Sequence, residues 1–176
     1  MTSHRRSPAR FLAPVLLALV LPVAAGPRAS ANEKAKSAAA FERLISLVGE
    51  WEGTNSSGQV KATYTLVSGG SALMERLKSA NEPEMLTLYT LDGDHLLVTH
   101  YCSMGNQPQM RTASITELSD SLSFKIVQVT GMKSPDEGHM TALILTMPDK
   151  DHFTQKWTFR DKGKEQSDLF QFTRKS

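Results

Sequence analysis

Apolar and polar residues alternate with a period of two through most of the chain after Gly49. Successive side chains of a β-strand point to opposite faces, so this alternation predicts strands with one buried face. Clusters of turn-forming residues, such as those at 55–58, 68–70 and 161–163, interrupt the alternation at short and even intervals. Ten strands are predicted, over residues 49–54, 59–67, 72–79, 84–91, 95–102, 109–117, 121–130, 138–147, 152–160 and 165–173.

The connections between these strands are short, and the Asp92-Gly93 pair is the clearest hairpin turn. No helix-sized segment separates any two strands, which argues against parallel βαβ units. The predicted fold class is therefore all-β, an antiparallel up-and-down barrel of about ten strands. A barrel is favoured over a sandwich because closure removes exposed edges. The loops at 103–108 and 131–138 are expected to be the longest and to flank a ligand portal.

One helix is predicted ahead of the strands, over residues 33–48. Phe41, Leu44, Ile45 and Val48 recur at the spacing of one helical face, and Gly49 is a helix stop signal. The apolar face of this helix is expected to pack on the sheet or against one end of the barrel.

The first 31 residues have the organisation of a cleavable secretory signal. Three arginines precede residue 11, no acidic residue occurs before Glu33, and residues 11–25 form an apolar run with two prolines. That run is shorter than the roughly 20 residues that a spanning helix needs. Ala29-Ser30-Ala31 has small residues where signal peptidases require them, so cleavage is expected after Ala31.

The domain prediction is thus a signal peptide over residues 1–31 and one barrel domain over 32–176, exported to the periplasm or the medium. The only cysteine is Cys102, so no lipid-carrying cysteine follows the apolar run and no intramolecular disulfide can form. Residues 1–31 hold four of the 20 basic residues and none of the 18 acidic ones, leaving 16 basic and 18 acidic residues. A domain with this charge is not expected to bind nucleic acid.

The first predicted strand follows the helix directly and reads Gly49-Glu-Trp51-Glu-Gly53. A Gly-x-Trp sequence at this place resembles the calycin superfamily of lipocalins and fatty-acid-binding proteins. The extended Gly-x-Trp-x-Gly is also similar to the nitrobindin-like barrels. Across residues 33–176 the chain resembles a group of uncharacterised secreted bacterial barrel proteins. The resemblance implies a barrel closed at one end by Trp51 and open at the other to a ligand cavity.

Nitrobindin-like proteins bind haem through a histidine late in the chain. Here the last histidine is His152, the segment 165–173 contains none, and Asn55 replaces the third glycine of the motif. No cofactor is therefore predicted, and haem remains an alternative.

Several residues are candidates for lining a ligand cavity. His100 and Cys102 share one strand face, and His139 begins another strand. The favoured interpretation makes the histidines polar groups in a mostly apolar cavity, and the alternative is a metal site of His100, His139 and Cys102. The abundant methionines suit an adaptable cavity, whereas the Phe153–Trp157–Phe159 face is interpreted as core. The predicted ligand-binding residues are Trp51, Tyr64, His100, Cys102, Gln107, Met110 and His139; no catalytic or metal-binding residue is predicted.

Familiar catalytic motifs are missing from the sequence, including a Gly-x-Ser-x-Gly elbow, a His-Glu-x-x-His helix and a glycine-rich phosphate loop. The predicted function is the binding of a small apolar or amphipathic molecule by an exported, non-catalytic barrel with no membrane span after signal cleavage. Three alternatives stay open. They are a haem or metal barrel, catalysis by a Cys102–histidine pair, and an interaction module with a filled barrel.

Overall fold

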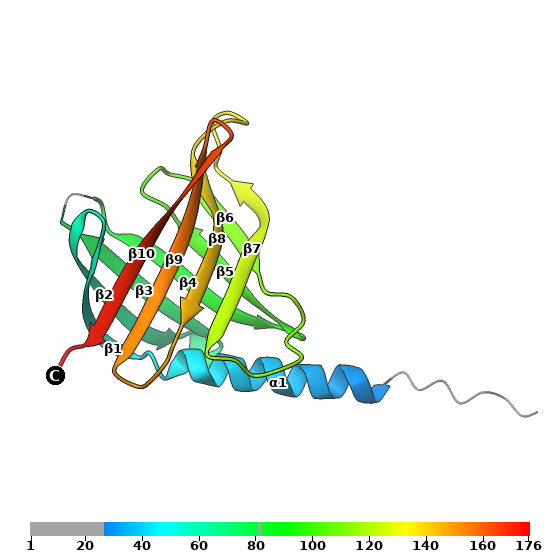
Figure 1. The fold of residues 1–176 in the computed structure, drawn as a ribbon. Coiled ribbons are helices and arrows are strands. Elements are labelled where there is room, and N and C mark those ends of the chain that lie inside the picture. The colour runs from blue at the N-terminus through cyan, green and yellow to red at the C-terminus, as the bar shows by residue number, and fades with distance from the viewer. Residues whose placement is uncertain (1–26, 81) are drawn as a thin grey trace, which may run out of the picture.

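The computed structural model describes residues 27–80 and 82–176, in which one helix precedes ten strands (Figure 1). The predicted signal segment lies outside the described residues up to residue 26. The elements are α1 (Pro27–Ile45), β1 (Gly49–Asn55), β2 (Gly58–Val67), a 3-10 turn η1 (Ser68–Gly70), β3 (Ala72–Ser79), β4 (Met85–Asp92), β5 (His95–Tyr101), β6 (Gln107–Arg111), β7 (Ser121–Thr130), β8 (His139–Thr146), β9 (His152–Asp161) and β10 (Lys164–Arg174).

The strands form one closed antiparallel barrel in which every strand pairs with its neighbours in the chain. Closure comes from pairing of the first strand with the last, with Trp51 opposite Arg174 and Thr54 opposite Gln171. The predicted fold class is confirmed. Because the barrel is closed, the backbone groups of β1 and β10 pair with each other and leave no open sheet edge.

β6 is shorter than the sequence predicted. It ends at Arg111, not at residue 117, because the chain then turns back onto the β4–β5 hairpin. The N–H of Leu96 donates to the Thr112 hydroxyl, and the N–H of Ile115 donates to the carbonyl of Asp94. Residues 112–120 therefore form a long loop at the helix end of the barrel, whereas residues 107 and 108 belong to β6 and not to a portal loop.

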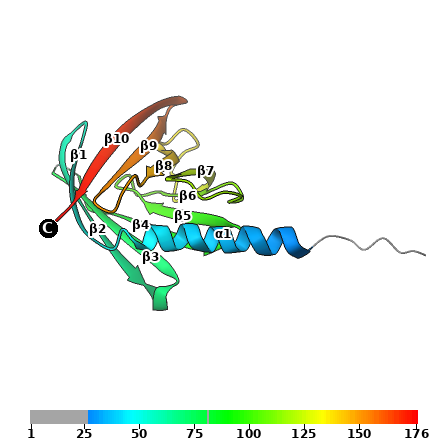
Figure 2. The same ribbon diagram turned by 60° about the horizontal axis from the view of Figure 1, so that its bottom comes forward.

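α1 lies across one end of the barrel (Figures 1 and 2). The buried residues Ala40, Phe41, Leu44 and Leu47 join the hydrophobic core there. Polar contacts fix the helix to the turns of this end. The Ser37 hydroxyl donates to the carbonyl of Gly93 (2.7 Å), while Arg43 donates to the carbonyl of Met147 (2.7 Å) and pairs with Asp120. The helix thus seals this end.

The helix boundaries differ from the prediction at both ends. α1 begins at Pro27 and ends at Ile45, three residues before the predicted end. The chain leaves the helix in a turn, so Leu47 points into the core and Val48 is 41 % exposed. The helical spacing that placed Val48 on the buried face no longer applies beyond Ile45.

Trp51 completes the sealed end. Its ring meets the Phe153 ring edge-on at 4.7 Å, and its indole N–H donates to the carbonyl of Leu47 (2.7 Å). The guanidinium of Arg174 lies 4.1 Å from the centre of the Trp51 ring. The same guanidinium donates to the carbonyls of Ser46 (2.8 Å) and Val48 (3.0 Å), so the last strand is tied to the chain segment after α1.

Gly53 allows β1 and β10 to approach closely where the barrel closes. A Cβ at this position would overlap the carbonyl oxygen of Gln171 and press on the Phe172 ring. Those atoms belong to a paired strand and a buried ring that stacks on Phe153 at 4.6 Å, so neither can move freely. The second glycine of the Gly-x-Trp-x-Gly sequence is therefore required by packing.

Substituting Gly53→Ala is expected to destabilise the protein by about 2 kcal/mol or more, since the added methyl group must displace backbone. The measurement is urea unfolding followed by tryptophan fluorescence. Thr54→Ala, at an exposed position of the same strand, is the control and should cost well under half as much. Equal losses in the two variants would contradict the close-approach argument.

Candidate ligand-binding site

A hollow of about 370 Å³ lies at the end of the barrel opposite α1. Its walls come from the strand ends and turns that meet there, including the β1–β2 turn and the β5–β6 turn. The lining residues are Asn55, Ser56, Ser57, Glu82, Met85, Cys102, Ser103, Met104, Met140, Trp157, Phe159, Gln166, Ser167, Asp168 and Phe170. This hollow is called the mouth pocket below.

The inner wall of the mouth pocket is apolar and rich in sulfur. Met85, Cys102, Met104 and Met140 contribute four sulfur atoms from three different parts of the barrel. Three aromatic rings, those of Trp157, Phe159 and Phe170, complete the wall. Methionine side chains are flexible and polarisable, so such a wall can adapt to apolar groups of different shapes.

The outer rim of the mouth pocket is polar. Asp168 accepts hydrogen bonds from the Asn55 side chain (3.0 Å) and from the backbone N–H of Ser56 (3.2 Å), which fixes the β1–β2 turn against β10. Glu82, from the β3–β4 connection, lies on the same rim. The pocket is therefore amphipathic, with an apolar wall inside and oxygen atoms at the entrance.

A buried polar network lies deeper in the barrel and supports the pocket wall. The Trp157 indole N–H donates to the Gln155 side-chain oxygen (3.0 Å), and the Gln155 amide donates to Tyr64 (2.7 Å) and Glu75 (2.8 Å). Tyr89 donates its hydroxyl proton to the other oxygen of Glu75 (2.7 Å). The network holds Trp157 in one orientation at the boundary between the filled interior and the mouth pocket.

Burial shapes the protonation of this network. Desolvation raises the pKa of the Glu75 carboxyl, although its hydrogen bonds with Tyr89 and Gln155 work in the opposite direction. Desolvation also raises the phenol pKa of Tyr64 and of Tyr89, and the nearby Glu75 charge adds to the effect. Both phenols therefore stay protonated, with Tyr89 donating to Glu75 and Tyr64 accepting from the Gln155 amide.

His100 lies next to this network and is buried. Its Nδ1 is 3.0 Å from the Thr87 hydroxyl, and its ring centre is 4.7 Å from that of Trp157. Its Nε2 has no hydrogen-bond partner among the described residues. Desolvation lowers the pKa of His100 from 6.5 to about 4, so the imidazole is neutral at physiological pH.

Of the predicted site residues, only Cys102 lines the mouth pocket. Trp51 lies at the sealed end, Tyr64 belongs to the buried network, and Met110 is buried in the core. Gln107 holds a turn, where it donates to the carbonyl of Gly105 (2.9 Å). The remaining two, His100 and His139, are not among the lining residues.

The sequence pattern indicates that the Phe153–Trp157–Phe159 face is core. Phe153 and Trp157 do belong to the buried core cluster, and Trp157 also forms part of the mouth-pocket wall together with Phe159. Met85, Met104 and Met140 were not predicted as site residues. Only Met85 lies on the inward face of a strand, whereas Met104 is in the β5–β6 turn and Met140 stands beside a bulge in β8, so strand periodicity gives no signal for these two.

The three residues of the alternative metal site do not come together. His139 points its Nδ1 at the carbonyl of Glu137 (2.8 Å), and it pairs across the sheet with Arg160. Within residues 27–80 and 82–176, no group of three or more His, Cys, Asp or Glu side chains is placed to hold a metal ion. A haem held by an axial histidine does not fit the mouth pocket either, because no histidine lines it.

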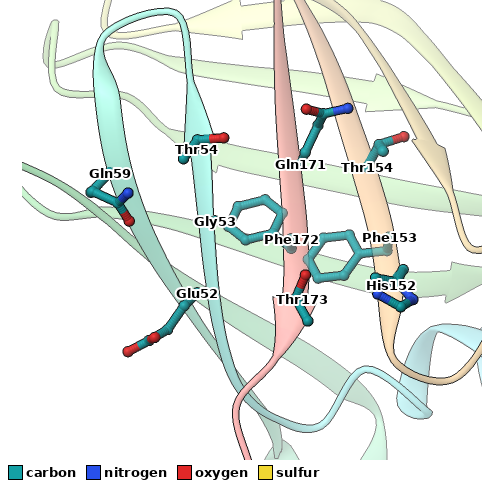
Figure 3. Close-up of a pocket in the computed structure, with 10 residues that line it drawn as sticks. All are labelled: Glu52, Gly53, Thr54, Gln59, His152, Phe153, Thr154, Gln171, Phe172 and Thr173. Atoms are coloured by element: carbon teal, nitrogen blue, oxygen red, sulfur yellow. The ribbon is translucent and has the colours of Figure 1, made fainter.

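A second hollow, of about 420 Å³, lies on the barrel wall where β1, β10 and β9 pair (Figure 3). Figure 3 shows the stacked rings of Phe153 and Phe172 beside Gly53, with threonine and glutamine side chains around them. The two phenylalanines are core residues of the sealed end. Because its apolar part is the packed core itself, this hollow is a weaker candidate than the mouth pocket.

Fold and site together define a closed antiparallel barrel with one sealed end and one end that carries an amphipathic pocket. Several solved structures share the fold, among them the following two. Rv2717c from M. tuberculosis aligns with a TM-score of 0.57 and 12 % identity over 78 % of this chain and 98 % of that one. A protein of unknown function from the DUF3598 family of Nostoc punctiforme aligns with a TM-score of 0.50 and 16 % identity.

The alignment with the Nostoc protein covers 75 % of this chain and 49 % of that chain, so this chain spans about half its length. At these identities the likeness concerns the fold alone. No family model matches the sequence, and no curated protein sequence matches it. Among the described residues, no helix is both long enough and apolar enough to cross a bilayer.

The His100 environment predicts a pH dependence of stability. The unfolded chain binds a proton at His100 below pH 6.5, whereas the folded state binds it only near pH 4. The stabilisation from neutral His100 is therefore complete above pH 6.5 and is lost as the pH falls toward 4, by about 3 kcal/mol in all. The raised pKa of Glu75 acts in the opposite sense, since it favours the folded state at low pH.

A comparison of wild type with His100→Gln isolates this effect, because the contribution of Glu75 is present in both proteins. The measurement is the free energy of urea unfolding at several values between pH 7 and pH 4. Wild type is expected to lose more stability than the variant over this range. His139→Gln controls for removal of a histidine as such. Parallel curves for wild type and His100→Gln would contradict the prediction.

Proposed function

We propose that this protein is a calycin-like, non-catalytic binding protein that takes a small apolar or amphipathic molecule into the mouth pocket. The observation that carries the proposal is the combination of an apolar, sulfur-rich wall with a polar rim at the one end of the barrel that α1 does not cover. Ligand pockets of proteins have this character, with a mostly apolar lining and few polar groups that orient the ligand.

The size of the pocket supports a small ligand. Its volume of about 370 Å³ lies toward the lower end of the range of ligand pockets, roughly 300–1,000 Å³. Burial of a methylene group contributes about 0.8 kcal/mol, so a chain of eight carbons gains about 6 kcal/mol before the cost of immobilising it. Dissociation constants between micromolar and millimolar follow for simple aliphatic probes.

The surroundings of Cys102 support binding without catalysis. A cysteine nucleophile needs a base or another means of forming a thiolate. No histidine is among the residues lining the mouth pocket, and His100 has its Nδ1 engaged with Thr87 below the pocket wall. Cys102 is instead one of several sulfur-bearing side chains that supply apolar surface.

The two tryptophans lie at opposite ends of the barrel and provide a test. In a Trp51→Phe background, fluorescence reports on Trp157 alone, and a ligand in the mouth pocket should change it in a saturable way. The same ligand should slow alkylation of Cys102 by iodoacetamide. Octanol, with its eight-carbon chain, is a suitable first probe.

Met140→Ala removes part of the pocket wall and is expected to weaken octanol binding about three- to tenfold, through lost apolar contact. Met74→Ala, on the outward face of β3, is the matched control and should leave binding unchanged. A probe that changes neither Trp157 fluorescence nor Cys102 alkylation at millimolar concentration would favour the interaction-module alternative.

We also propose that the protein is exported through its first 31 residues. Cleavage after Ala31 would shorten α1 at its N-terminal end, which extends past the barrel in Figure 1. The contacts that seal the barrel begin near Ser37 and would remain. The shortened helix would therefore still dock.

Mass spectrometry of the protein recovered from outside the cytoplasm of a bacterial host should give the mass of residues 32–176. Replacing Ala29 and Ala31 by arginine should leave the precursor uncleaved, because signal peptidases need small residues at both positions. Full-length protein confined to the cytoplasm would contradict the export proposal. Arginine at Ser30 is the control, since that position tolerates larger residues.

A further inference from the structure

We infer that the natural ligand of the mouth pocket carries a positive charge, as an aliphatic amine with an apolar tail does. This inference rests on the proposed function and specifies the chemistry of the ligand. It comes from the charges at the rim, from a small polar recess beside the pocket and from one buried hydroxyl that has no partner within residues 27–80 and 82–176.

The charges of the pocket have one sign only. Glu82 and Asp168 are among the lining residues, and no lysine, arginine or histidine is. Two arginines of strands that border the pocket are engaged elsewhere, because Arg76 of β3 pairs with Glu84 (2.6 Å) and Arg160 of β9 with Glu165 (2.7 Å). A carboxylate ligand would therefore meet two carboxylates and no basic partner, whereas an ammonium group would meet complementary charge.

A smaller hollow of about 180 Å³ adjoins the mouth pocket. Asn55, Ser57 and Glu82 line both hollows, so the two lie side by side and share these residues as a wall. The other residues around the smaller hollow are Gln59, Ser79 and Ala80. Nearly all of its polar side chains can accept hydrogen bonds, which makes it a recess for a polar head group next to an apolar wall.

The Ser79 hydroxyl is a separate observation that points to a ligand group in the smaller hollow. It lies on the inward side of β3, is 7 % exposed and lines the smaller hollow. Its hydroxyl oxygen has no hydrogen-bond partner among the described residues. Buried hydroxyl groups are normally paired, so an unpaired one beside a recess indicates a group that binds there. An ammonium has three N–H donors and no acceptor, so the Ser79 hydroxyl and the Glu82 carboxylate are suited to accept from it.

The test compares three molecules with the same eight-carbon tail and different head groups: octylammonium, octanol and octanoate. The readouts are Trp157 fluorescence in the Trp51→Phe background and protection of Cys102, both at neutral pH. Octylammonium is expected to bind at least about fivefold more tightly than octanol, and octanoate is expected to bind more weakly than octanol. The advantage of octylammonium should shrink at high salt, because the rim charges are accessible to ions.

Two variants locate the head group. Glu82→Gln and Ser79→Ala should each weaken octylammonium about threefold or more and leave octanol binding unchanged. Glu117→Gln removes an exposed carboxylate from the 112–120 loop at the sealed end and is the control for net charge.

Each outcome separates the inference from the proposed function. If octanol or octanoate binds as tightly as octylammonium, the inference is overturned while the proposed function stands. If none of the three molecules binds, both fail together. Equal weakening of octylammonium by Glu82→Gln and by Glu117→Gln would show a general charge effect and would also overturn the inference.

Discussion

Pairing of β1 with β10 is the constraint on which the rest of the structure depends. It turns a ten-strand sheet into a barrel, and it is possible only because Gly53 leaves room for the backbone of Gln171. The β1–β10 pairing also places the Arg174 guanidinium over the Trp51 ring and within hydrogen-bond distance of the Ser46 carbonyl, just after α1. Barrel closure and the sealing of one end are therefore parts of one arrangement, since the residue that ends β10 also fastens the helix connection.

Sealing one end makes the two ends chemically different. At the sealed end, apolar side chains of α1 meet stacked phenylalanines and Trp51. In the middle, Glu75, Tyr89 and Gln155 form a network whose members satisfy one another. Buried polar groups that are fully paired stiffen a core, so this layer gives the mouth pocket a rigid floor. The pocket wall above it includes three methionines, whose flexible side chains adapt to different shapes. A rigid floor under an adaptable wall is a suitable arrangement for a binding site with modest selectivity of shape.

Local pattern was enough to predict the fold. Strand alternation and turn residues place nine of the ten strands within two residues of their observed ends, and the Asp92-Gly93 turn is where the pattern put it. The predicted end of β6 was wrong because Thr112 and Ile115 form hydrogen bonds with the β4–β5 hairpin, and such a contact between distant segments does not affect strand periodicity.

The site was harder to predict for the same reason. Of the residues predicted to bind a ligand, Cys102 alone lines the mouth pocket, since depth along the barrel axis depends on how the strands are staggered. Periodicity distinguishes inward from outward residues, but it does not show how deep a residue lies along the barrel axis. It therefore does not distinguish Tyr64 in the buried network from Met140 in the pocket wall.

The seam between β1 and β10 also bears on the order of folding. Its two strands lie about 120 residues apart in sequence, and closing so large a loop is slow compared with forming the hairpins between them. During synthesis, which starts at the N-terminus, β1 to β9 can form early, but the barrel cannot close until Arg174 is available. Until then one edge of β1 is unpaired, and the Arg174 guanidinium does not yet lie over the Trp51 ring. The barrel therefore stays open until β10 has been synthesised, and the residues around Arg174 complete its closure.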